Sequence, residues 1–86
     1  IANAISSAQM ELAQSREAQA LATEQLKLAS ERAEWIAKGF RLGQFDLLVQ
    51  LRSLQEKFDA ESESARSRLA VDRAISRLNQ AVGVLP

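Results

Sequence analysis

Apolar and small residues recur along the first half of the chain at intervals of three and four, which is the spacing of a heptad repeat. Segment 1–41 contains no proline and its first glycine is Gly39, whereas the good helix formers Ala, Glu, Gln and Leu abound and Lys also occurs. The recurring positions are Ile1, Ile5, Ala8, Leu12, Ser15, Ala22, Leu26, Ala29, Ala33, Ile36 and Phe40, with Gln19 as a single polar break. The pattern predicts a helix over about residues 1–41 that packs one face against a neighbour.

A second apolar stripe lies about a third of a turn around the same predicted helix. It consists of Leu21, Leu28, Trp35 and Leu42. A helix with one apolar stripe needs one neighbour, so the two stripes together predict two neighbours.

The chain between the two predicted helices carries the residues that end one helix and begin another. Gly43 can adopt the left-handed backbone conformation that terminates a helix at little cost. Asp46 is a good N-cap, because its carboxylate can accept hydrogen bonds from free backbone N–H groups. We therefore predict a turn over about residues 42–46, and two long helices joined by so short a link run antiparallel.

The second predicted helix covers about residues 47–82, again without glycine or proline, and Gly83 and Pro86 follow it. Its apolar residues form two groups on nearly opposite sides, separated by the polar segment 59–68. The first group is Leu47, Leu51, Leu54, Phe58, Ala65 and Leu69, and the second is Val71, Ile75, Leu78 and Val82. Heptad drift of about 20° per repeat is too small to explain this swap. The pattern predicts that the helix changes its neighbour along its length.

The composition restricts the chemistry available to the chain. There is no His and no Cys, which removes the commonest general bases, thiol nucleophiles and transition-metal ligands. Glu61 and Glu63 lie two residues apart and do not face each other on a helix, which indicates a solvated surface. Met10 and Trp35 are interpreted as packing residues. We expect no enzymatic activity, no cofactor and no metal.

Charge and hydrophobicity exclude two further classes of partner. Eleven basic and eleven acidic residues balance, so no basic excess points to nucleic acid. No apolar run approaches the roughly 20 residues of a membrane span. With three Phe, one Trp and no Tyr, the chain can line a long shallow seam but cannot fill a thick core. This predicts that its packing partners are other chains or further parts of its own chain.

The turn and the end of the second helix share a spacing with a known repeat. Phe40 precedes Gly43 by three residues and Asp46 follows it by three, while the helix closes with the segment 78–83, whose Gly83 lies forty residues after Gly43. This arrangement resembles the helical repeat of the TolC-like outer-membrane efflux channels, which reads aromatic-x-x-Gly-x-x-Ser-x-Leu and ends in a Leu–Ala–Leu–Gly-like segment. The resemblance covers the chain from about Ala18 onward.

The resemblance implies a fold, an assembly and a location. In that family such hairpins lie side by side as staves of a periplasmic α-helical barrel, below a β-barrel in the outer membrane. The channel is a trimer in which each protomer contributes two hairpins, and the turn end meets a periplasmic adaptor protein that links the channel to an inner-membrane pump. The chain is thus expected to be an all-α, antiparallel two-helix coiled-coil hairpin from a larger channel protein of the Gram-negative envelope.

The resemblance also implies a docking surface. We expect Arg41, Leu42, Gly43 and Asp46 at the tip to receive the adaptor hairpin. Because a single hairpin can bury only one of its two stripes, we further expect the isolated chain to self-associate, for example as a four-helix bundle.

One departure and two alternatives remain. Many family members carry Leu-Asp-x-Leu-Asp just after the tip, whereas segment 48–52 here has no carboxylate, so the channel gates differently or its other hairpin supplies the constriction. One alternative is the α-hairpin of the adaptor itself. Its tip motif begins with Arg followed four residues later by Leu, a pair that is absent here. The other alternative is an unrelated coiled-coil scaffold.

Overall fold

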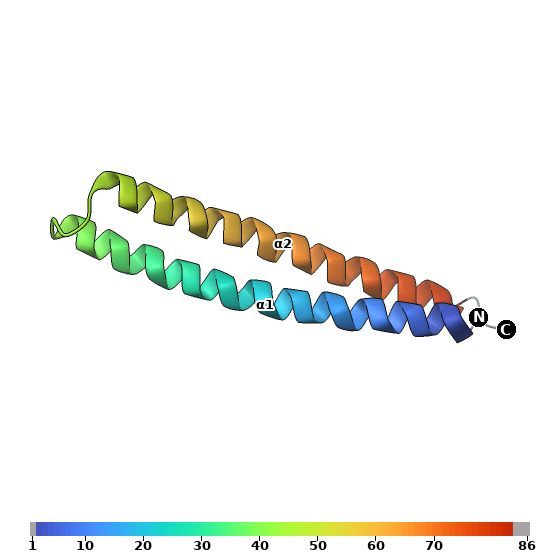
Figure 1. Cartoon of the computed structure of the whole chain (residues 1–86). Coiled ribbons are helices and arrows are strands. Elements are labelled where there is room, and N and C mark those ends of the chain that lie inside the picture. Colours follow the sequence, from blue (N-terminus) through green and yellow to red (C-terminus); the bar gives the residue numbers. More distant parts are fainter. Residues whose placement is uncertain (1, 84–86) are drawn as a thin grey trace.

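The protein folds as a two-helix hairpin. The computed structural model describes residues 2–83, in which α1 (Ala2–Arg41) and α2 (Leu47–Gly83) lie side by side and antiparallel (Figure 1). The predicted all-α hairpin fold is therefore confirmed. With 40 and 37 residues, the helices are about 60 and 55 Å long at about 1.5 Å per residue. Of the sequence positions singled out above, Ile1 and Pro86 lie outside the described residues.

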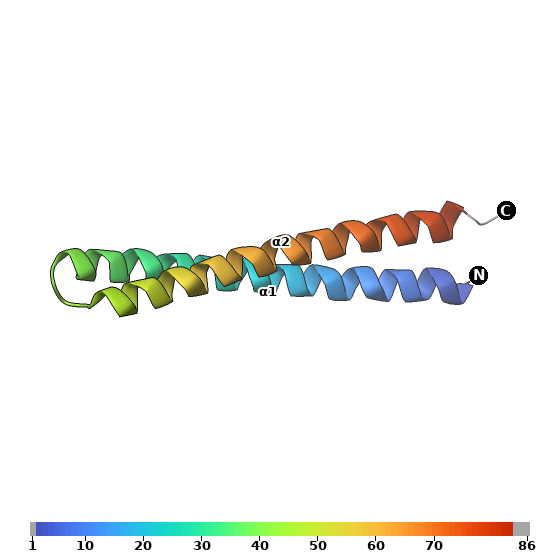
Figure 2. The same ribbon diagram turned by 90° about the horizontal axis from the view of Figure 1, so that it is seen from above.

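The two helices cross at a shallow angle. They run alongside each other in one view, and in the perpendicular view α2 passes over α1 near the middle of the hairpin (Figures 1 and 2). A straight helix repeats every 3.6 residues, so a seam repeating about every 3.5 residues requires the helices to coil slowly around each other. The crossing therefore follows from the heptad spacing of the buried positions.

The buried face of α1 is the one that the heptad pattern predicts. Ala8, Ala22 and Ala33 are buried. Between them, Leu12, Leu26, Ile36 and Phe40 are half-buried, because each larger side chain reaches past the edge of the seam. Alanine at the closest points lets the helix backbones approach, and the longer side chains fill the space beside them.

The buried face of α2 differs from the prediction. The residues that pack against α1 are mostly small: Ser53, Ser64, Ser67, Val71 and Ala74 are buried. Together with half-buried Ala60, Leu78 and Ala81, the last four of them repeat with three-and-four spacing from position 60 to position 81. Ser53 lies seven residues before Ala60 on the same line. α2 keeps the same seam against α1 throughout, and of the two predicted apolar groups only the second contributes to it, through Val71 and Leu78. The first group stays exposed, so the expected change of neighbour stays a prediction about contacts outside the hairpin. The serines were missed because a hydrophobicity pattern counts them as polar, although their side chains are small enough for a close contact between two helices.

The buried hydroxyl group of Ser53 has a hydrogen-bond partner within its own helix. Ser53 Oγ donates to the carbonyl oxygen of Gln50 one helical turn earlier, at 2.8 Å. Within residues 2–83 no buried side-chain nitrogen or oxygen is left without a hydrogen-bond partner. A serine that bonds its own helix backbone presents little more than a methylene group to the neighbouring helix.

Most of the large apolar residues that do not enter the seam form two exposed stripes. The "α1 stripe" comprises Leu21, Leu28, Trp35 and Leu42, and the "α2 stripe" comprises Leu47, Leu51, Leu54, Phe58 and Leu69. All nine side chains are exposed, and Phe58, at 66% exposure, is among the most accessible. Isolated exposed apolar residues are ordinary, but two aligned rows indicate contact surfaces.

Two ion pairs connect the helices across one face of the hairpin. Arg32 Nη1 lies 3.3 Å from Glu56 Oε2, and Arg77 pairs with Glu11 near the other end. All four side chains are at least 41% exposed to solvent, so each pair adds little to stability. Their main effect is on the alignment of the two helices, since both pairs are satisfied only in one register.

Candidate docking surface at the tip

The end of α1 is closed by a Schellman motif. The backbone N–H of Gln44 donates to the carbonyl of Gly39 at 2.8 Å, and that of Gly43 donates to the carbonyl of Phe40 at 3.0 Å. Gly43 has a φ of 78°, in the left-handed region where a side chain would be strained. The predicted role of Gly43 in ending the helix is thus present in the structure.

The start of α2 is capped by Asp46. Its Oδ1 accepts a hydrogen bond from the backbone N–H of Val49 at 3.0 Å, the third residue of the helix. The carboxylate thereby satisfies one of the four N–H groups that a helix start leaves free, and its charge is favourable beside the positive end of the helix dipole. Asp46 therefore acts as the N-cap that the sequence predicts.

We expect Asp46→Ala to lower the stability of the hairpin by about 1 kcal/mol, because the Val49 N–H loses its partner. Thermal unfolding followed by circular dichroism measures the loss. Asp72→Ala, which removes an exposed carboxylate from the middle of α2, is the matched control and should have a smaller effect. Equal losses in both variants would show that the cap contributes nothing beyond its charge.

The structure places the four predicted docking residues together at the turn. Arg41 is the last residue of α1 and is exposed, and Leu42, at 76% exposure, projects beside it. Nothing lies within 4 Å of the position that a Cβ would occupy at Gly43, so a partner can approach its backbone closely. Asp46 is also exposed, but one of its oxygens is already engaged by the cap. The available surface at the tip is therefore centred on Arg41, Leu42 and Gly43.

Two further tip residues were not singled out from the sequence. The ring of Phe45 lies over Gly39, so closely that a Cβ at Gly39 would clash with ring carbons Cδ2 and Cε2. The same ring packs against Trp35, with ring centroids 5.9 Å apart and a tilt of 58°. The sequence could have indicated this contact, because Gly39 stands within the last turns of a long helix, where alanine would be preferred. Trp35 is thus a packing residue in part, although its side chain is 68% exposed.

The α1 stripe and the α2 stripe lie on opposite faces of the hairpin. Leu28 lines a groove together with Arg32 and Glu56, on the face that carries the interhelical ion pairs. Leu54 lines a different groove together with Ala37. Arg32 and Ala37 flank the α1 seam on opposite sides, because five residues correspond to about 140° around a helix. The hairpin therefore offers one apolar row on each face.

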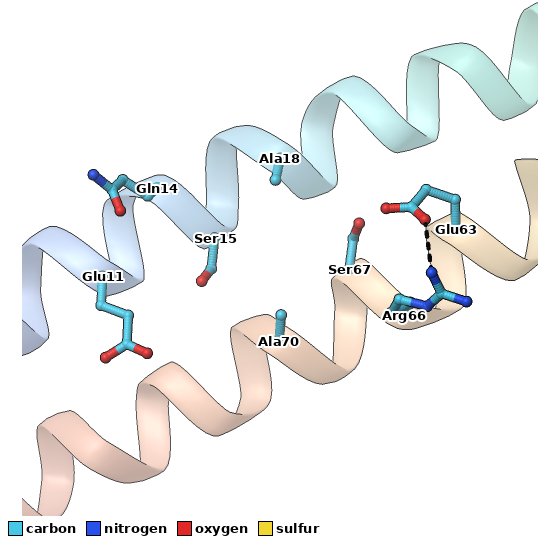
Figure 3. A pocket seen from close by; sticks show the side chains of 8 residues that line it. All are labelled: Glu11, Gln14, Ser15, Ala18, Glu63, Arg66, Ser67 and Ala70. Atoms are coloured by element: carbon cyan, nitrogen blue, oxygen red, sulfur yellow. Dashed lines mark hydrogen bonds and ion pairs between the residues drawn. The ribbon is translucent and has the colours of Figure 1, made fainter.

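The shallow groove between the helices farther from the tip does not form a binding site. It has a volume of about 340 Å³ and is lined by small residues of both helices together with polar and charged residues. Figure 3 shows Glu11 at one end and the Glu63–Arg66 pair at the other, with Ser15, Ala18, Ser67 and Ala70 between them. The charged groups do not converge on one point, and each is paired: Glu63 with Arg66 at 3.5 Å and Glu11 with Arg77. The groove is a consequence of small residues at a close helix contact.

The part of the chain that the structure describes offers little other chemistry. It contains no group of three or more acidic side chains placed to hold a metal ion. Neither α1 nor α2 has a stretch both long and apolar enough to cross a bilayer. Comparison with protein families, curated proteins and solved structures found no match for this chain.

Proposed function

We propose that this hairpin is the periplasmic structural segment of an outer-membrane efflux channel and that its tip docks the adaptor protein of a tripartite export pump. The proposal rests on the resemblance of the tip and of the end of α2 to the TolC-like repeat. The observation that carries it is the placement of the two apolar stripes on opposite faces, because a stave in a barrel contacts one neighbour on each side. The other hairpins of the channel cover these stripes.

The tip supports the docking part of the proposal. Leu42 offers an apolar contact, and Arg41 offers several N–H donors suited to carboxylates or to the free carbonyl groups at a helix end. The open space at Gly43 allows the backbone of a partner to come close between them. These three features lie at three consecutive residues, Arg41 to Gly43, where the end of another helical hairpin could contact all of them.

Photo-crosslinking in the complete channel tests this function. A photoreactive residue at exposed Gln44 is expected to capture the periplasmic adaptor in cells. Leu42→Asp should reduce this capture by about tenfold or more, because an unpaired carboxylate would be buried in the contact. Met10→Asp also replaces an exposed apolar side chain with a carboxylate, in α1 but far from the tip, and it should leave capture intact.

Three outcomes would overturn the proposal. Capture of other proteins but never of an adaptor would end it, and so would an equal effect of Leu42→Asp and Met10→Asp. Unchanged export by a well-expressed Gly43→Trp channel would also contradict docking at the tip. This variant is less specific than Leu42→Asp, because the φ of 78° at Gly43 makes any side chain there costly to the turn itself.

A further inference from the structure

Phe45 occupies a special place in the turn. Gln44 completes the Schellman motif that ends α1, and Asp46 is the N-cap that begins α2, so Phe45 is the residue between the two caps. Each cap fixes the end of its own helix and leaves open how the two ends are joined. The Phe45 side chain makes that connection, because its ring returns to α1 and lies over Gly39.

Two residues of α1 form the site in which the Phe45 ring packs. Gly39 is buried, and the space that its missing Cβ leaves is filled by ring carbons of Phe45. Trp35, one turn earlier, flanks the ring in the tilted arrangement that aromatic pairs favour. Glycine is disfavoured relative to alanine inside a helix, and the ring accounts for its presence here.

We infer that Phe45 is a positioning residue whose ring, held by Gly39 and Trp35, keeps the tip in one shape before any partner binds. We call these three residues the tip lock. The lock lies next to Arg41, Leu42 and Gly43, and it prevents the turn from sampling other conformations that would present these groups differently. A preformed surface avoids the entropic cost of ordering the turn on binding. The role in docking rests on the proposed function, whereas the lock itself rests only on the geometry of the tip.

A double-mutant cycle on the 86-residue chain tests the lock directly. Gly39→Ala should lower the melting temperature by about 5 °C or more, because the new methyl group displaces the Phe45 ring. In the background of Phe45→Ala, the same Gly39→Ala change should raise the melting temperature by about 2–5 °C, since only its higher helix propensity remains. The sign of the effect therefore depends on whether the ring is present.

Tryptophan fluorescence provides a second measurement, because the emission of the folded chain does not depend on its free energy of unfolding. Trp35 is the only tryptophan of the chain, so at a concentration where the chain is monomeric its emission reports on the tip. Gly39→Ala and Phe45→Ala should each shift the folded-state emission to longer wavelength, because the indole loses its aromatic neighbour and contacts more water. Gly83→Ala is the control: a Cβ there meets nothing within 4 Å, and the emission should not change.

The outcomes separate the lock from the proposed function. The lock is wrong if Gly39→Ala has the same sign with and without Phe45, or if neither tip variant changes the emission. If both results support the lock, Gly39→Ala in the complete channel should also reduce adaptor capture at position 44, and unchanged capture would contradict the positioning role. A wild-type channel that never captures an adaptor would refute the proposed function while leaving the sign reversal and the emission shift in place.

Discussion

Ala74→Leu is expected to destabilise the hairpin by about 1–3 kcal/mol, because added methylene groups have no room in a well-packed contact. Ala74 is the most buried residue of α2, at 1% exposure, and it lies in the seam against α1. A leucine there must push the helices apart and thereby separate the neighbouring contacts at Val71 and Leu78. For a chain of this size, each kcal/mol of lost stability lowers the melting temperature by roughly 4–8 °C.

Ala65→Leu is the matched control for this experiment. It makes the same substitution in the same helix, but Ala65 is exposed and lies outside the seam. Both residues are good helix formers, so little change is expected at this position. Urea or thermal unfolding of the two variants at one protein concentration gives the comparison. If Ala65→Leu were the more damaging change, the assignment of the Ser- and Ala-lined face of α2 to the seam would be wrong.

Replacing three residues of the α2 stripe with glutamine is expected to weaken self-association of the chain while the hairpin stays folded. Leu51, Leu54 and Phe58 are exposed in the single hairpin, so they can be buried only against another chain or another part of a larger protein. Burying what remains accessible on three such side chains contributes about 2–4 kcal/mol, which corresponds to a change in affinity of about 30-fold or more. Glutamine removes this gain and is itself compatible with a helix.

Sedimentation velocity over a range of concentrations measures the effect, with circular dichroism to confirm that the helices persist. The control replaces Met10 and Val82 with glutamine, since both are exposed and lie outside the two stripes. The control should associate as the original chain does. A chain that remains monomeric at high concentration before any substitution would contradict the expected self-association, and a loss of helix in the triple variant would show that the α2 stripe stabilises the single hairpin instead.

The main difference between expectation and structure lies in α2. The sequence suggests that the strongly apolar side formed by Leu51, Leu54 and Phe58 would meet a neighbour, and within the hairpin it does not. The face that meets α1 contains Ser64 and Ser67 in its middle third, which a hydrophobicity pattern classifies as polar. Ranking positions by side-chain volume would have revealed an unbroken three-and-four repeat of small residues along much of α2. Such a line favours close helix packing even when some of its members carry hydroxyl groups.

The features that the sequence determines by itself are those whose cause is local. The two helices follow from residue propensity and from the absence of proline, and the turn follows from the backbone freedom of Gly43 and the capping carboxylate of Asp46. The buried face of α1 can also be predicted locally, because its heptad positions and the residues of the α1 stripe lie on clearly different sides of the helix. The exposure of Arg41 and Leu42, which we propose for docking, follows from their place at the turn.

The tertiary structure decided which face of α2 turns toward α1 and where Phe45 goes. By periodicity alone, either of two faces of α2 could meet α1. The choice depends on how closely the two backbones can approach when both seams are lined by small side chains. This distance is a property of the pair of helices and not of either helix alone. The seat of Phe45 on Gly39 exists only after the chain has reversed direction, because the ring then returns to a helix six residues earlier. Both features depend on contacts between separate segments, which helix propensity and periodicity along one segment do not contain.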